Sequence, residues 1–366
     1  MLLGCFFTRS IELEGVGSLA LGLAEGFVQT GWEVDMLLPE GNYPAVAGAS
    51  QVRFSGGLGK FRRALKEMSS RCEAVLLIEN NPNLARTADA SRCGDATWSL
   101  FVTPLQSLSL LGELGLGTQG LAHALSKHHL FARTIRWRGR RVIVASRYQA
   151  RQLHALGADR VAVMPVCGRS RAQSIPNRQA ARAQLGWDNR PVVGYLGHFS
   201  RAKGVDVLVD AFAGMEGSAV LALAHSGKGQ FCQAGRLRLE ELRRAGRLRQ
   251  VGQTNPTTFL AACDVVALPY ITSSVFHQPQ VLLESLAAGT AVITTEVGGV
   301  GELIQPGGNG LLCPPGDVAA LRGAMRQMLA QPAEAAEMGR QGRALFESRL
   351  AREVFCQEFD QLVTSG

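Results

Sequence analysis

This chain of 366 residues lacks several features that would assign it to a narrow class of protein. No apolar run approaches the ~20 residues that a helix needs to cross a bilayer. Its eight cysteines are scattered and form no CxxC pair with the spacing of a metal site. The N-terminal run MLLGCFF has neither a basic flank nor a cleavage site, so we interpret it as a buried strand rather than a signal peptide. Together these absences predict a cytosolic protein with free thiols and no metal site.

The best-known nucleotide-binding signatures are missing as well. Gly15-Val16-Gly17-Ser18 follows the first predicted strand, but no third glycine completes the GxGxxG fingerprint. Ser226-Gly227-Lys228-Gly229 is too short for a GxxxxGK[ST] loop. Glycine still allows a backbone to pass close to a phosphate at a helix start. Gly15 and Gly17 are therefore candidate phosphate contacts, and a plain tight turn is the alternative.

The composition is that of a globular protein with room for two domains, since 46% of residues are hydrophobic and 19% are charged. The formal net charge is +8, and +7 of it falls in residues 1–172. Residues 132–151 form a dense basic segment around Trp137, with Arg133, Arg136, Arg138, Arg140, Arg141, Arg147 and Arg151. Such a segment favours an anionic membrane surface, a lipid diphosphate or nucleic acid, while a solvated helix end is the simpler reading. No nucleic-acid module is recognisable, so we do not expect a nucleic-acid partner.

Strands and helices alternate along the first half. The expected strands are 2–7, 32–38, 74–78, 97–102, 141–146 and 160–165, and the expected helices are 17–30, 58–70, 119–136 and 147–156. This alternation predicts a parallel sheet with helices on both faces. The polar segment 166–190 contains no strand pattern and is expected to be a linker.

The same alternation restarts in the second half. The expected strands are 191–197, 219–225, 248–252, 264–270 and 291–295, and the expected helices are 204–215, 233–246, 281–289, 317–330, 333–348 and 350–364. We therefore expect an α/β protein with two doubly wound, Rossmann-like domains, residues 1–172 and 173–349, facing a cleft.

Residues 279–312 are the most informative stretch. Glu284 lies in a predicted helix that Gly289 can close in a left-handed turn. After a short apolar strand, a turn with Gly298 and Gly299 is expected to open another helix that contains Glu302. Backbone N–H groups at such a helix start suit a phosphate, and a carboxylate beside them suits sugar hydroxyls.

This stretch resembles the nucleotide-sugar-binding segment of retaining glycosyltransferases of the GT-B fold, the family-four group. Their pattern pairs two glutamates eight residues apart, followed by Val-Gly-Gly-x-x-Glu and Asn-Gly-Leu-Leu. The matching residues here are Glu284, Gly289, Gly298, Gly299, Glu302, Asn309 and Gly310. The resemblance covers most of the chain and is strongest over 191–345. It implies that the last helix, within 350–366, crosses back onto the first domain.

The resemblance also implies individual roles. Glu284 would hold the ribose hydroxyls of the donor, and Glu302 would close the motif or only cap its helix. Residues 197–204 resemble the family's Gly-Arg-x-x-x-x-Lys-Gly, whose two cations grip the donor diphosphate. Lys203 matches this pattern, whereas His198 occupies the arginine position and Arg201 is the nearby substitute. Cations there would stabilise the leaving diphosphate.

A second departure concerns the donor sugar. The first glutamate of the pair is replaced by Phe276, so His277 or Gln278 would have to make the polar contact. The family usually has Gly-x-Gly near the nucleotide where this chain has Gly227, and its glycine-rich first loop corresponds to Gly15 and Gly17. Glu79-Asn80-Asn81 are candidate acceptor contacts, with a helix cap as the alternative for Asn81. We assign no catalytic histidine, no metal and no cofactor.

The sequence therefore predicts a retaining hexosyltransferase that uses a nucleotide-diphosphate sugar as donor. Its acceptor would be a sugar or a lipid-linked sugar of envelope or polysaccharide assembly, reached from the cytoplasm or from the inner membrane face. The departures at His198 and Phe276 favour one alternative, a weakly catalytic homologue that acts as a nucleotide-sugar-binding or scaffolding subunit. A nucleotide-sugar epimerase is a third and less favoured reading.

Overall fold

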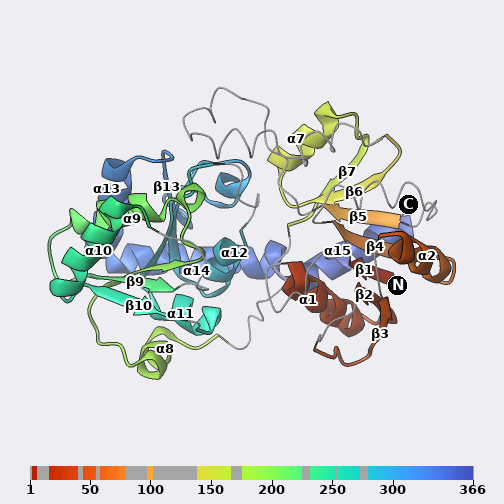
Figure 1. Ribbon diagram of the computed structural model, residues 1–366, viewed down its shortest axis with the longest axis horizontal. Coiled ribbons are helices and arrows are strands. Elements are labelled where there is room, and N and C mark those ends of the chain that lie inside the picture. The colour runs from red at the N-terminus through yellow and green to blue at the C-terminus, as the bar shows by residue number, and fades with distance from the viewer. Residues whose placement is uncertain are drawn as a thin grey trace. The chain divides into compact units, whose positions relative to one another are not determined.

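The computed structural model describes residues 2–5, 16–39, 44–54, 58–79, 97–101, 138–165, 175–224, 231–252, 254–272 and 279–365. The chain folds as two compact units. Met1–Arg169 and Arg352–Gly366 form the first unit, and Ser170–Ala351 forms the second. Each unit has one parallel sheet with helices packed against it (Figure 1). The predicted doubly wound α/β architecture is therefore confirmed.

The sheet of the first unit has seven strands in the order β3-β2-β1-β4-β5-β6-β7. Its strands are β1 (Leu2–Cys5), β2 (Val34–Pro39), β3 (Ala49–Phe54), β4 (Val75–Glu79), β5 (Thr97–Phe101), β6 (Arg141–Val144) and β7 (Arg160–Val163). The described helices are α1 (Val16–Gln29), α2 (Leu58–Ser69), α7 (Arg147–Ala155) and α15 (Arg352–Ser365). Every predicted strand is present, whereas the edge strand β3 was missed because it has no continuous apolar run. The predicted helix over 119–136 lies outside the described residues.

Residues on the central strands of this sheet alternate between two cores. Met36 and Leu38 belong to the core under α1 and α15, whereas Leu37 belongs to the core under α2. Successive side chains of a strand point to opposite faces, so a sheet covered on both sides needs apolar residues at every position. This requirement explains why the strands appear in the sequence as continuous apolar runs.

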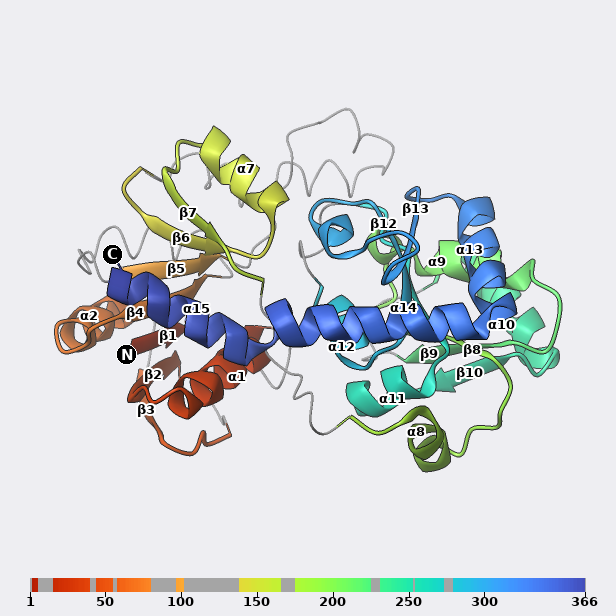
Figure 2. The same cartoon turned by 180° about the vertical axis from the view of Figure 1, so that it is seen from behind.

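Helix α15 is part of the first unit although the whole second unit precedes it in the chain (Figure 2). Its Phe359 packs edge-to-face against Phe27 of α1, with ring centroids 5.4 Å apart. Arg352 forms a 2.8 Å ion pair with Glu25 while its own side chain is only 3% exposed. The two helices approach so closely at Gly26 that a β-carbon there would lie 2.8 Å from the Cys356 sulfur. Helix α15 therefore completes the core of the first unit.

The second unit has six parallel strands in the order β10-β9-β8-β11-β12-β13. They are β8 (Val192–Leu196), β9 (Val220–Ala224), β10 (Leu248–Val251), β11 (Val265–Leu268), β12 (Ala291–Thr295) and β13 (Gly310–Cys313). The helices are α8 (Arg178–Leu185), α9 (Val205–Ala213), α10 (Gln233–Arg244), α11 (Pro256–Ala262), α12 (Gln280–Ala287), α13 (Val318–Ala330) and α14 (Pro332–Leu345). A π-helical turn, η5 (Phe346–Leu350), follows α14. The prediction missed β13, α8 and α11.

The expected linker over 166–190 is wrong for the part that forms α8. This helix is held to the sheet by Asp264, which accepts hydrogen bonds from Arg178 at 3.0 Å and Arg182 at 2.6 Å. The same carboxylate also accepts a 2.7 Å hydrogen bond from the backbone N–H of Val192. A helix held by ion pairs to a residue more than eighty positions away leaves little apolar periodicity in its own sequence.

The strand order of the second unit reverses direction between β8 and β11. From β8 the chain continues through α9 to β9 and β10 on one side, and later returns to β11, β12 and β13 on the other. In open parallel sheets, ligands bind at the carboxyl ends of the strands at such a switch point. The segments that follow β8 and β11 are therefore where a functional site is expected.

Candidate functional site

The turn after β8 carries the cation of the site. It includes a 3₁₀ turn, η3 (Arg201–Lys203), and begins at Gly197, whose φ of +151° lies outside the usual range for other residues. The hydroxyl of Tyr195 donates a 2.8 Å hydrogen bond to the carbonyl of His198. A β-carbon on Gly197 would lie 3.3 Å from the Tyr195 hydroxyl and 3.5 Å from the Lys203 ammonium. Because Gly197 has no side chain, the Lys203 ammonium can lie close to the backbone of the turn.

Lys203 is suited to bind an anion. Its side chain is partly buried, and burial lowers the pKa of its ammonium. Among the residues that the structure describes, no carboxylate forms an ion pair with it. A cation that is withdrawn from water without a protein counter-ion gains more from an anionic ligand than a fully solvated lysine would.

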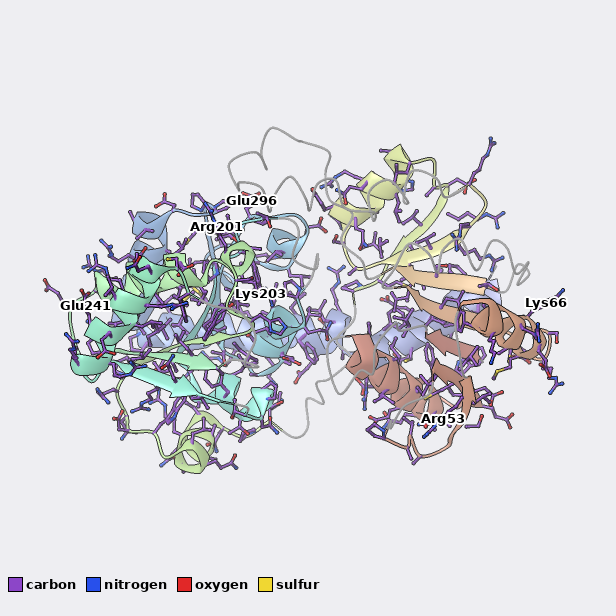
Figure 3. The ribbon with its side chains drawn as sticks, in the orientation of Figure 1. Arg53, Lys66, Arg201, Lys203, Glu241 and Glu296 are labelled. Atoms are coloured by element: carbon purple, nitrogen blue, oxygen red, sulfur yellow. The ribbon has the colours of Figure 1, made fainter. Side chains whose placement is uncertain are left out.

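Arg201 lies on the same turn but in a different setting. A 3₁₀ helix has three residues per turn, so residues two apart point about 120° away from each other. In Figure 3 the labelled Arg201 and Lys203 side chains accordingly lie apart from each other, and Arg201 is exposed. Its predicted role as a second cation stays a prediction.

The turn after β8 is locked to the loop after β11. The N–H of Ile271 donates a 2.9 Å hydrogen bond to the carbonyl of Ala202. Gly204 has a φ of +68°, and a β-carbon on it would lie 1.8 Å from the carbonyl oxygen of Pro269. The two segments that flank the switch point are therefore in direct contact, and their close approach requires glycine at position 204.

Glu284 lies on α12, which follows the loop after β11. Its side chain is 5% exposed, and it occupies the second turn of the helix. The helix ends as predicted in Gly289, which adopts a left-handed conformation. There the N–H of Thr290 donates to the carbonyl of Ser285, and the N–H of Gly289 donates to the carbonyl of Leu286. Burial and the charge of Glu284 raise the pKa of the Tyr270 phenol, so this neighbouring group stays neutral.

The turn after β12 differs from the prediction. Gly298 adopts a φ of +57°, but only a four-residue 3₁₀ turn follows, η4 (Val300–Leu303). Two backbone N–H groups form hydrogen bonds within the turn. The N–H of Val300 donates to the carbonyl of Val297 at 3.0 Å, and the N–H of Glu302 donates to the carbonyl of Gly299 at 3.3 Å. So short a helix has almost no macrodipole, and the predicted helix start at Gly298–Gly299 is corrected to a tight turn. Glu302 is exposed on it.

Two further residues of the motif shape the backbone. Asn309 is buried, and its amide donates to the carbonyl of Leu303 at 2.8 Å while its side-chain oxygen accepts from the N–H of Gln305 at 2.8 Å. A β-carbon on Gly310 would lie 2.5 Å from the carbonyl oxygen of Val292. These residues close the loop between η4 and β13, which is a structural role that the sequence pattern does not reveal.

The other predicted site residues lie outside the described residues or belong to the first unit. Gly15, Gly227, Phe276, His277, Gln278, Asn80 and Asn81 lie outside the described residues. Gly17 belongs to α1 of the first unit, and Glu79 ends β4 there. Within the described part of the chain, no group of three or more His, Cys, Asp or Glu residues is placed to hold a metal ion. Lys203, His198, Glu284 and the Gly298–Gly299 turn all belong to the second unit.

Comparison with known proteins shows which proteins this part of the chain is similar to. Residues 177–345, nearly all of the second unit, match the family model of glycosyl transferases group 1. This part of the chain is similar to group 1 glycosyltransferases. A lipopolysaccharide core biosynthesis glycosyltransferase of Rhizobium meliloti, LpsE, is 31% identical over 178 residues, which are 48% of this chain and 50% of that protein. The chain thus matches about half the length of this relative.

Solved structures extend the likeness to the whole chain. Sucrose-phosphate synthase from Thermosynechococcus elongatus has a TM-score of 0.80 at 21% identity and covers 100% of this chain and 98% of its own. Anabaena HepE in complex with UDP-glucose has a TM-score of 0.71 at 17% sequence identity. The match covers 100% of this chain and 99% of the HepE chain. At these identities the likeness establishes the fold, which is the predicted GT-B fold of two doubly wound units.

Proposed function

We propose that this protein is a group 1 glycosyltransferase that moves a sugar from a nucleotide-diphosphate sugar to a sugar or lipid-linked acceptor, with retention of configuration at the anomeric carbon. The observation that carries the proposal is the placement of Lys203 and Glu284 on the segments that follow β8 and β11, on either side of the switch point. A buried cation suits the diphosphate, and a buried carboxylate suits the ribose hydroxyls. The lipopolysaccharide role of the Rhizobium relative supports an acceptor of envelope assembly.

In the proposed reaction, an acceptor hydroxyl forms a bond to C1 of the sugar on the face from which the diphosphate departs. The bond between C1 and the phosphate oxygen breaks, and the hydroxyl proton leaves with the nucleoside diphosphate or passes to solvent. Negative charge grows on the departing phosphate, where the Lys203 ammonium stabilises it. Glu284 fixes the nucleoside, so that binding energy remote from C1 holds the reacting atoms in place.

The test is a thermal shift with a panel of nucleotide-diphosphate sugars, followed by an assay for released nucleoside diphosphate. UDP-glucose is the first donor to try, because Anabaena HepE was solved in complex with it. A donor that stabilises the protein and releases its diphosphate supports the transferase. Stabilisation without release, with acceptors present, supports the binding-subunit alternative, and an isomerised donor supports an epimerase. No stabilisation by any nucleotide contradicts the proposal.

Replacing Glu284 with alanine is expected to weaken nucleoside diphosphate binding about 10- to 100-fold, because hydrogen bonds to a charged group contribute roughly 1.5–3 kcal/mol each. Isothermal titration with the donor's nucleoside diphosphate measures the change. The matched control is Glu241→Ala on α10, where an exposed carboxylate pairs with Arg238 on the protein surface. Unchanged affinity in Glu284→Ala contradicts the ribose contact.

We also propose a peripheral contact of the first unit with an anionic membrane surface. No helix among the described residues is long and apolar enough to cross a bilayer. The basic segment is divided by β6, which leaves exposed Arg138 before the strand and exposed Arg147 and Arg151 on α7 after it. Co-sedimentation with phosphatidylglycerol vesicles is expected at low salt and should fall as salt rises. Equal binding to phosphatidylcholine vesicles would contradict an electrostatic contact.

A further inference from the structure

Two buried tyrosines at the switch point have no part in the proposed reaction. Tyr195 lies on β8 with none of its surface exposed, and Tyr270 follows β11 with 2% exposed. Burial and the neighbouring Tyr270 phenol raise the pKa of Tyr195, so both phenols stay protonated. Burying a hydroxyl without a hydrogen bond costs free energy. The group to which a buried phenol bonds therefore indicates the role of that tyrosine.

The partner of the Tyr195 hydroxyl is the backbone of the turn that carries Lys203. Its 2.8 Å hydrogen bond to the His198 carbonyl fixes the His198–Phe199 peptide, one residue beyond Gly197. The same hydroxyl lies 3.3 Å from the point where a Gly197 β-carbon would be, and the Lys203 ammonium lies 3.5 Å from that point. One phenol oxygen therefore binds the turn at the His198 carbonyl and also lies beside Gly197, close to the ammonium.

Tyr195 is itself held in place by its surroundings. Its ring lies 6.2 Å from that of Phe199, which in turn lies 4.4 Å from the ring of Phe231. The loop of Tyr270 is bound to β12, because the Thr295 hydroxyl donates a hydrogen bond to the Tyr270 carbonyl at 2.6 Å. The Tyr195 ring is therefore packed among aromatic residues, while its hydroxyl is hydrogen-bonded to the turn after β8.

We propose that Tyr195 is a positioning residue for donor binding: its hydroxyl sets the conformation of the turn at the His198 carbonyl and thereby the place of the Lys203 ammonium at the diphosphate. This inference rests on the proposed function. It makes a prediction that a merely structural role does not, because Lys203 would contact the diphosphate but not the nucleoside. Loss of the hydroxyl should weaken only ligands that carry phosphate.

The experiment measures dissociation constants of the donor's nucleoside diphosphate and of the free nucleoside by isothermal titration. Tyr195→Phe is expected to bind the diphosphate about tenfold more weakly and the nucleoside with unchanged affinity. In the double variant with Lys203→Met, the further loss caused by Tyr195→Phe should nearly vanish, because both changes act on one contact. The control is Thr290→Val, which removes a buried hydroxyl bonded to the Leu260 carbonyl at 2.9 Å, at the amino end of β12.

Each outcome bears on the proposal. Equal diphosphate binding by Tyr195→Phe and the wild type overturns it while leaving the proposed function intact. Parallel weakening of diphosphate and nucleoside, or an equal effect of Thr290→Val, shows general support of the fold and also overturns it. If the wild type binds no nucleotide at all, the proposed function fails and this inference fails with it. A selective loss that depends on Lys203 supports it.

Discussion

Replacing Lys203 with methionine is expected to lower kcat for sugar transfer by about 10²- to 10³-fold, as does the loss of one charge-stabilising donor in other enzymes. The reason is that charge develops on the departing diphosphate beside an ammonium that burial has already withdrawn from water. Steady-state kinetics with the identified donor measures the effect. The control is Lys66→Met on α2 of the first unit, which removes an exposed ammonium and should leave kcat unchanged.

The same variant should not lose thermal stability. Because burial depresses the pKa of Lys203, its charged form is disfavoured in the folded state, and this penalty is relieved as pH rises through the folded pKa. Methionine removes the buried charge, so the melting temperature is expected to stay level or rise. Affinity of the wild type for the diphosphate should fall as pH rises through the pKa of Lys203, and this fall should be absent in the variant. A large drop in melting temperature would mean that activity was lost through unfolding.

Gly204→Ala is expected to destabilise the second unit by about 2–5 kcal/mol, the sum of a conformational and a steric part. The left-handed φ of +68° costs a residue with a β-carbon about 1–2 kcal/mol. In addition, that β-carbon would lie 1.8 Å from the Pro269 carbonyl oxygen, so the two segments that flank the switch point must separate. Urea denaturation measures the loss, and hydrogen exchange assigns it to the strands of the second unit.

Gly186→Ala is the matched control for this change. Gly186 ends α8 with a φ of +65°, almost that of Gly204, but nothing lies within 4 Å of its β-carbon position. It should therefore lose only the conformational part, about 1–2 kcal/mol. Equal losses in the two variants would show that the contact with Pro269 is unimportant.

The elements that were predicted correctly are those whose burial is visible in their own residues. Strand β12 is buried throughout and consists of Ala, Val, Ile and two Thr residues, which favour a buried strand, and Gly289 marks the end of α12. The elements that were missed depend on distant partners. Strand β3 is an edge strand with exposed Val52 and Arg53, and α8 is held by Asp264. Neither arrangement leaves a periodic apolar pattern in the segment itself.

The candidate site was predictable to a similar extent. Lys203 and Glu284 were chosen because they belong to a spaced pattern, and the structure places them on segments that follow β8 and β11, while their roles stay predictions. The helix expected after Gly298 was wrong, because a glycine-rich turn is compatible with either a long helix or the short η4. Tyr195 was missed because a tyrosine within an apolar strand is indistinguishable from an ordinary core residue.

The sequence by itself determined the alternation of strands and helices, the two doubly wound units and the identity of the charged residues, because local periodicity and glycine placement specify these. Only the tertiary structure decided that Gly204 must lack a side chain, that Asn309 closes a loop and that Tyr195 supports the turn of Lys203. The Pro269 carbonyl comes close to Gly204 only once β8 and β11 have paired. The Leu303 and His198 carbonyls are near their partners in the sequence, but they are reached only in the turn conformations that the folded chain adopts.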